Sequence, residues 1–123
     1  YPEYDAKNLF VRDDKKKNYY LITVKGDKRV DLKEFRKKHG LRVLSFASPE
    51  DLFKYMKLTP GAVTPLGLLN DDDCKIRFYL DSDFSDSIIG VHPNDNTATV
   101  WLQANDLVKL VREHGNEVEI VKI

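Results

Sequence analysis

The sequence has one cysteine, few glycines and prolines, and no long hydrophobic run. Cys74 alone cannot form an intrachain disulfide and leaves no cysteine-rich zinc site, so we expect a reducing compartment. Six glycines and five prolines, beside 41% hydrophobic residues, exclude collagen-like, low-complexity and disordered chains. The composition therefore indicates a globular protein with a sizeable core.

Membrane and polyanion-coating functions are also disfavoured. No apolar segment approaches the roughly 18 residues that cross a bilayer, and the first five residues lack a signal-peptide layout. Twenty basic side chains balance twenty acidic ones, so any contact with RNA must be local. We expect a cytoplasmic protein with no membrane partner and, from its 123 residues, a single domain over 1–123.

Three helices are predicted from capping residues and apolar spacing. The segment 31–39 opens with a possible capping box of Asp31 and Glu34. The segment 48–57 opens with a serine, a proline and two acids, which is the pattern of a helix start, and 104–114 has helical apolar spacing. The side chains expected to be buried are Leu52, Phe53 and Met56 in the second helix, and Leu107, Leu110 and Val111 in the third.

Strand-like segments account for most of the remaining chain. Residues 9–11 and 19–24 suit a hairpin with a charged tip. The other strand-like segments are 75–81, 87–92, 97–102 and 117–123. Hairpin neighbours mixed with helical crossovers indicate an α+β (mixed α/β) domain with a single curved mixed sheet of about six strands and about three helices.

An apolar loop follows the second predicted helix. Residues 58–70 contain two prolines and two glycines, a pattern that disfavours both a regular helix and an ordinary strand. A loop stiffened in this way suits the wall of a pocket, because its backbone amides stay available while its side chains exclude water. A buried connector is the alternative interpretation.

Common catalytic motifs are missing. The sequence has no Gly-x-Ser-x-Gly elbow, Walker loop, Gly-x-Gly-x-x-Gly or paired-histidine zinc helix, so we expect no cofactor and no metal. The acids at 71–73 could attract a cation, but adjacent like charges more often mark a solvated turn. Cys74 has no histidine near it in the sequence to act as a base, so we expect it to be a packing residue.

The three histidines differ in their surroundings. His39 and His114 each precede a glycine at a predicted helix end, where a positive charge complements the helix dipole, so we expect structural roles. His92 lies in a polar turn after a predicted strand, where hydrogen-bonding groups can converge. A binding turn and a structural turn are both consistent with that pattern.

Three segments together resemble one known family. They are KNLF at 7–10, GAVTPLGL at 61–68, and HPN followed by NTAT within 92–99. They resemble the YbaK and aminoacyl-tRNA-synthetase-associated editing domains, most closely the free-standing prolyl-tRNA editing proteins of the alanyl-tRNA(Pro) deacylase type. The resemblance covers about residues 7–123. Relatives carry an N-terminal portion ahead of the KNLF segment, which we expect to be missing here.

The resemblance implies a metal-independent trans-editing hydrolase that deacylates mischarged alanyl-tRNA(Pro), with no cofactor. Its partners would be the alanine-bearing acceptor end of tRNA(Pro) and prolyl-tRNA synthetase. It implies that Lys7 is catalytic. The implied substrate-binding residues are Asn8, the loop residues Gly61, Ala62, Val63, Thr64, Pro65 and Gly67, and His92, Asn96 and Thr97 beside the terminal adenosine. A non-catalytic tRNA-binding or regulatory module of the same fold, or a plain interaction domain, stays open.

Elementary chemistry agrees with this implied activity. The substrate ester is already activated, so water can attack once the carbonyl is oriented and its developing charge is stabilised. A pocket sized for a methyl group would exclude the proline ring by overlap. Phosphates of the tRNA would be held by some of Lys15, Lys16, Lys17, Lys25, Lys28, Arg29, Arg36 and Lys37, although an ordinary charged face explains each of them equally well.

Overall fold

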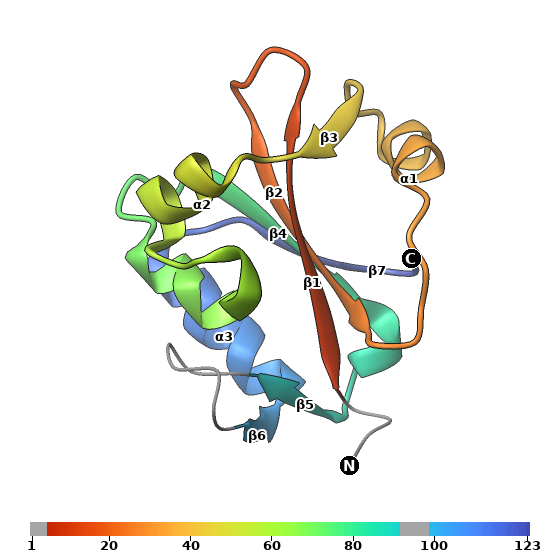
Figure 1. The fold of residues 1–123 in the computed structure, drawn as a ribbon. Coiled ribbons are helices and arrows are strands. Elements are labelled where there is room, and N and C mark those ends of the chain that lie inside the picture. Colours follow the sequence, from red (N-terminus) through yellow and green to blue (C-terminus); the bar gives the residue numbers. More distant parts are fainter. Residues whose placement is uncertain (1–4, 92–98) are drawn as a thin grey trace.

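The computed structural model describes residues 5–91 and 99–123, and a five-stranded mixed sheet forms its centre (Figure 1). The strand order is β3-β1-β2-β4-β7. β1 pairs antiparallel with β2 and β3, whereas β4 pairs parallel with β2 and β7. The strands of this sheet are β1 (Ala6–Asp13), β2 (Tyr19–Lys25), β3 (Leu44–Phe46), β4 (Ile76–Asp81) and β7 (Val118–Val121).

The predicted α+β class is confirmed, but the single sheet is not. Within the described residues, β5 (Ile88–Val91) and β6 (Val100–Gln103) form a separate antiparallel pair. A 3-10 helix at Ser82–Phe84 turns the chain directly after β4, and Gly90 of β5 forms an isolated bridge with Asp5, the residue before β1, rather than a ladder with β1. Apolar alternation identifies a strand but not its partner, which is why the sequence suggested one sheet.

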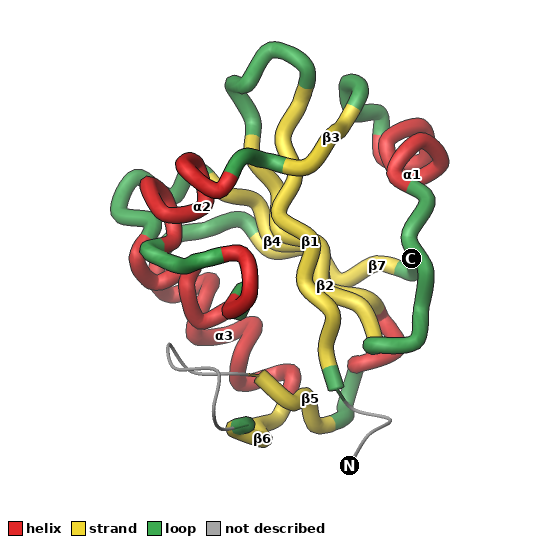
Figure 2. Tube along the Cα trace, viewed as in Figure 1, coloured by secondary structure: helices red, strands yellow, loops and turns green. Residues whose placement is uncertain are grey.

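Helices cover both faces of the large sheet (Figure 2). One face carries α1 (Leu32–His39), which packs through Phe35. The other carries α2 (Pro49–Met56) and α3 (Ala104–His114). Each face therefore has its own apolar core, and none of the described helices is long and apolar enough to span a bilayer.

The predicted helix starts are confirmed by their caps. The Asp31 carboxylate accepts hydrogen bonds from the backbone N–H groups of Lys33 and Glu34, and the Ser48 hydroxyl accepts one from Asp51. These bonds satisfy donors that a first helical turn leaves unpaired. The ends of α1 and α3 at Gly40 and Gly115 also match the sequence.

Two of the six predicted core positions on helices are wrong. The Phe53 side chain is 59% exposed and Leu110 is 41% exposed. In the short α2, Leu52 and Met56 lie one turn apart and already cover the core, so their neighbour Phe53 points outward. In α3, Val108 packs beside Leu107 and takes the buried place expected for Leu110.

The proline-bearing loop contains short helices after all. Pro60–Ala62 and Pro65–Asn70 are 3-10 helices, each beginning at a proline. The fixed φ of proline suits a first helical position, where no N–H donor is needed, and 3-10 turns tolerate such short runs. The expectation that this segment excludes helix therefore holds only for the α-helix.

A buried tyrosine fixes α2 against the sheet. The Tyr19 hydroxyl donates to the Asp51 carboxylate at 2.9 Å, and its ring lies 4.7 Å from that of Tyr55. Burial, with the Asp51 carboxylate beside it, raises the pKa of Tyr19 well above its usual value. The start of α2 is consequently held at a defined distance from β2.

An ion pair links the connection after β2 to the end of β4. Lys28, on the connection after β2, contacts the fully buried carboxylate of Asp81 and the exposed carboxylate of Asp83. These bonds raise the pKa of Lys28 and lower that of Asp83. Lys28 is thus engaged within the protein, which argues against the expectation that it contacts a tRNA phosphate.

We expect Lys28→Gln to lower the free energy of unfolding by about 1–3 kcal/mol, because it leaves the buried Asp81 carboxylate without its cation. Asp83→Asn is the matched control and should cost less than about 1 kcal/mol, since Asp83 is exposed. The bond to Lys28 lowers the pKa of Asp83, so the Asp83→Asn difference should be present at pH 7 and shrink below about pH 4. Urea unfolding of the three proteins measures both effects, and equal losses at pH 7 would contradict the assignment.

Candidate functional site

A cavity of about 290 Å³ opens between β1, the start of α2 and the proline-bearing loop. Its walls are mostly apolar. Asn8 supplies the one polar side chain among the described residues that line it, which are Asn8, Phe10, Phe46, Ala47, Pro49, Leu52, Pro60 and Val63. The cavity therefore combines apolar walls with a single amide, an arrangement typical of small-molecule sites.

Asn8 joins the strand to the loop. Its side-chain Nδ2 donates to the Val63 carbonyl oxygen at 3.2 Å, across 55 positions of the sequence. Its Oδ1 accepts a hydrogen bond of 2.6 Å from the Thr23 hydroxyl on β2. Two of the segments singled out in the sequence, 7–10 and 61–68, thus meet at one cavity wall.

The other predicted loop residues do not line the cavity. Thr64 and Pro65 are buried, and the Thr64 hydroxyl accepts a hydrogen bond from the Leu66 N–H at 3.3 Å. Gly67 is also buried and its N–H donates to the Thr64 carbonyl at 3.0 Å. Gly61 is exposed and Ala62 is half-buried. Of the predicted loop residues, Val63 is the one that lines the cavity.

The side chains of Lys7 and Asn8 lie on opposite faces of β1. It is paired with the buried Val24, whose side chain belongs to the core under α1, whereas Asn8 is paired with Thr23. Directly opposed residues of two strands share a face of the sheet. The half-buried Lys7 is therefore next to the cavity along the chain but is not one of its lining residues.

The predicted residues His92, Asn96 and Thr97 lie outside the described residues. The strand before them ends at Val91, and Gly90 on that strand forms a bridge with Asp5. The chain thus enters the 92–98 segment close to the start of β1. Their roles stay predictions of the resemblance.

The structure brings a histidine to Cys74 that the sequence did not suggest. The Cys74 Sγ lies 3.8 Å from His114 Nδ1, which also contacts Asn116 Oδ1 at 2.7 Å. Burial and the acids at 71–73 raise the pKa of the Cys74 thiol, which disfavours the reactive thiolate. Cys74 therefore fits the predicted packing role, and His114 belongs to a polar cluster as well as to a helix end.

The acidic turn is also engaged within the protein. The buried Asp71 carboxylate accepts hydrogen bonds from the Ile76 N–H at 2.8 Å and from Asn116 Nδ2 at 2.9 Å. The prediction of a solvated turn is confirmed for Asp72 and Asp73, which are exposed, and is wrong for Asp71, which is buried because it bonds to these two groups. Among residues 5–91 and 99–123, no group of three or more His, Cys, Asp or Glu side chains could hold a metal ion.

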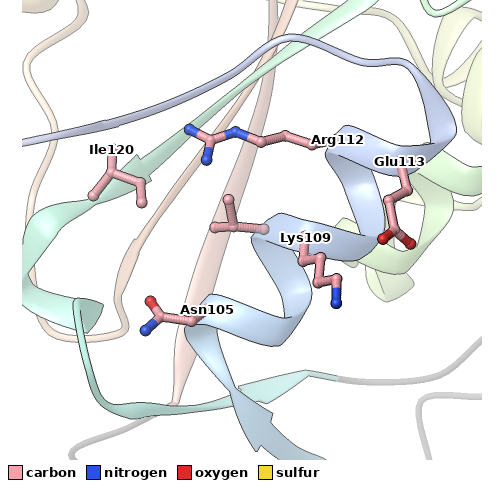
Figure 3. A pocket seen from close by; sticks show the side chains of 6 residues that line it. Asn105, Lys109, Arg112, Glu113 and Ile120 are labelled. Carbon is pink, nitrogen blue, oxygen red and sulfur yellow. The ribbon is translucent and has the colours of Figure 1, made fainter.

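A larger cavity of about 400 Å³ lies between α3 and β7 (Figure 3). It is lined by Val108, Ile120 and four polar or charged side chains of α3. The Arg112 guanidinium donates to the Val118 carbonyl oxygen at 3.2 Å and so ties α3 to β7 beside it. None of the predicted site residues lines this cavity, so we do not assign the candidate site there.

Basic residues are concentrated in the β1–β2 turn and in α1. The Arg42 guanidinium binds the Asp14 carboxylate through Nε at 2.6 Å and through Nη2 at 3.0 Å, and so joins the turn to the segment after α1. We call this area the basic surface; it comprises Lys15, Lys16, Lys17, Lys33, Arg36 and Lys37. The chain is neutral overall, yet this region carries a local positive charge.

Comparisons with known proteins identify the family of this chain. The profile of the aminoacyl-tRNA editing domain family matches residues 2–110. The chain belongs to this family. It is 43% identical over 122 residues to the prolyl-tRNA editing protein ProX of Acetoanaerobium sticklandii, covering 98% of this chain and 74% of that protein.

Two further similarities extend the picture. The prolyl-tRNA synthetase associated domain-containing protein 1 of Mus musculus is 36% identical over 117 residues, covering 91% of this chain and 69% of that protein. A crystal structure described as a proposed trans-editing enzyme for prolyl tRNA synthetase superposes with a TM-score of 0.75 at 24% identity, covering 100% of this chain and 73% of the other. The fold of this editing domain is therefore shared with distant relatives.

The two loop glycines should respond differently to alanine. A Cβ at Gly67 would lie 2.5 Å from Leu58 Cδ1 and 3.0 Å from Met56 Cε, whereas one at Gly61 would meet no atom within 4 Å. Because Leu58 and Met56 are themselves buried, we expect Gly67→Ala to destabilise the fold by about 1–3 kcal/mol. Gly61→Ala should change stability by less than about 0.5 kcal/mol. Thermal unfolding of both variants measures this, and a stable Gly67→Ala protein would contradict the packing described here.

Proposed function

We propose that this editing domain hydrolyses alanyl-tRNA(Pro) in trans, releasing alanine and free tRNA. The supporting observation is the small apolar cavity in which Asn8 and the proline-bearing loop meet. Its volume of about 290 Å³ lies at the lower end of ordinary ligand sites, so it suits the aminoacyl end of a substrate. Membership of the editing family and the similarity to a prolyl-tRNA editing protein support the same reaction.

Hydrolysis of this ester requires few catalytic groups from the protein. The ester between alanine and the ribose is activated relative to an amide, and water attacks it once the carbonyl is oriented. The Asn8 amide can donate a hydrogen bond to that carbonyl as negative charge develops on it. In this proposal the reaction uses no metal, because amide and ammonium groups supply the stabilisation.

Lys7 is the proposed cation. Its side chain starts on the far face of β1, but β3 pairs only with residues 11–13 of that strand. The edge of β1 beside Lys7 is therefore not covered by β3, and a lysine has a flexible four-carbon stem. The ammonium group can pass around this edge to a substrate held at Asn8.

Size selectivity follows from the cavity walls. The space available to the amino acid is bordered by Pro49, Pro60 and Val63. A lost methylene changes discrimination by only about 1–3 kcal/mol, but a proline ring that overlaps stiff walls is excluded much more strongly. Alanine enters and proline is rejected, while other small amino acids are rejected less well.

The basic surface is the proposed contact for tRNA(Pro). It lies beside β3, whose last residue Phe46 lines the cavity, while its first residue Leu44 packs under α1. Strand residues rise about 3.3 Å each, so Leu44 under α1 lies roughly 7 Å along β3 from Phe46 at the cavity. We propose that an acceptor end in the cavity directs its phosphates along this edge of the sheet, toward Lys16 and Lys37. We propose a cytoplasmic setting and prolyl-tRNA synthetase as the source of the mischarged substrate.

One observation favours a second candidate function. Lys7 does not line the cavity in this structure, which would suit a module that binds aminoacyl-tRNA without hydrolysing it. Such a module would retain affinity for the acceptor end but show no turnover.

Lys7→Ala should reduce the rate of alanine release from alanyl-tRNA(Pro) by about 100-fold or more, because loss of one group that stabilises the developing charge has effects of that size. The matched control is Lys109→Ala on the outer face of α3. Circular dichroism verifies folding of both variants. Equal rates in wild type and Lys7→Ala would refute the role of Lys7, and tRNA binding without any alanine release by the wild type would favour the second function.

The double change Lys16→Glu and Lys37→Glu should raise KM for alanyl-tRNA(Pro) several-fold and leave hydrolysis of a short alanyl-nucleotide ester unchanged. Because the double variant removes two lysine–phosphate interactions, it should also flatten the slope of log affinity against log salt by about 1.4–1.8. Lys109→Glu serves as the charge control. If both double and control variants behave as wild type, the tRNA binds on another surface.

A further inference from the structure

Thr23 is a fully buried hydroxyl in the middle of an apolar strand. It lies on β2 directly opposite Asn8 and is paired on its other side with Leu80 of β4. A valine has nearly the same shape and suits a buried strand at least as well. Packing alone therefore does not explain the hydroxyl, whereas its 2.6 Å bond to Asn8 Oδ1 does.

The two bonds of the Asn8 side chain determine which way its amide points. The Val63 carbonyl can only accept a hydrogen bond, so the group that faces it must be the Asn8 NH₂. Oδ1 is then on the side of Thr23, where the hydroxyl donates to it. This orientation follows from the partners themselves, independently of how amide oxygen and nitrogen are assigned.

We propose that Thr23 is the positioning residue of this site, holding the Asn8 amide so that one N–H fastens the proline-bearing loop and the second remains for a ligand in the cavity. The consequence for substrate rests on the proposed function above. Thr23 itself touches no substrate, because it is 0% exposed and is not a lining residue of the cavity.

Loss of the hydroxyl has a definite structural result. Without the Thr23 hydroxyl, Asn8 Oδ1 has lost its hydrogen-bond donor, and the side chain is held only by its bond to the Val63 carbonyl oxygen. The amide then moves over a wider range of angles, so its link between β1 and the loop weakens and Val63 is held less firmly. The cavity wall becomes less stiff, which weakens orientation of the alanyl ester and relaxes rejection of the larger proline.

The decisive variants are Thr23→Val, which removes only the hydrogen bond, and Thr23→Ser, which restores it. In Thr23→Val we expect kcat/KM for alanyl-tRNA(Pro) to fall about 5- to 10-fold, the factor that one neutral hydrogen bond represents. The ratio of alanyl to prolyl ester hydrolysis should fall as well. Thr23→Ser should restore both values to within about twofold of wild type.

A second readout does not depend on catalysis. In ¹⁵N-labelled wild-type protein, the side-chain NH₂ signals of Asn8, identified by their loss in Asn8→Asp, should be well separated and slow to exchange with solvent. In Thr23→Val they should broaden and exchange faster, and in Thr23→Ser they should resemble wild type. Val111→Ala, a change in the α3 part of the core, controls for reduced stability and should leave these signals and the alanyl-to-prolyl ratio unchanged.

The outcomes separate the two proposals. If wild type shows no deacylation, the proposed function fails, while the NH₂ signals still test the role of Thr23. Unchanged Asn8 signals in Thr23→Val would overturn the positioning role. So would a loss of activity in Thr23→Ser equal to that in Thr23→Val, or a Val111→Ala protein that shows the same loss of selectivity.

Discussion

The candidate site depends on one side-chain amide that joins two distant parts of the chain. Asn8 holds the carbonyl of Val63, and Thr23 holds Asn8, so three segments share a single short chain of hydrogen bonds. A buried hydrogen bond of this kind contributes modestly to stability, but leaving its partners unpaired is costly. The proline-bearing loop is therefore kept at a defined distance from β1, and the cavity between them has a definite size.

The rest of the fold serves to keep this arrangement rigid. β1 and β2 lie in the middle of the large sheet, with an apolar core on each face. α2 is fastened to β2 through Tyr19 and Asp51, and it supplies the opposite wall of the cavity through Pro49 and Leu52. The loop wall and the α2 wall of the cavity are therefore both fixed to the β1–β2 hairpin. A site built in this way can discriminate by size, because neither wall moves without disturbing the core.

Local features of the chain were predicted well because their causes are local. Asp31 and Ser48 mark helix starts by bonding N–H groups two or three residues ahead, and Gly40 allows the left-handed backbone that ends α1. Features that depend on residues far apart in the sequence were not predicted. The sequence around Cys74 does not indicate that His114 lies beside it. The alternation of apolar and polar residues does not predict that β5 pairs with β6 in a separate sheet.

Sequence by itself determined the family, the α+β class and the helix limits, and it singled out Asn8 and the 61–68 segment as candidate site residues. These follow from short-range spacing and from a motif resemblance. Only the tertiary structure decided that Lys7 and Asn8 start on opposite faces of β1, that Lys28 is bound to Asp81, and that Thr23 holds the Asn8 amide. The physical reason is that strand register and long-range hydrogen bonds arise from the packing of the whole chain, which no local pattern encodes.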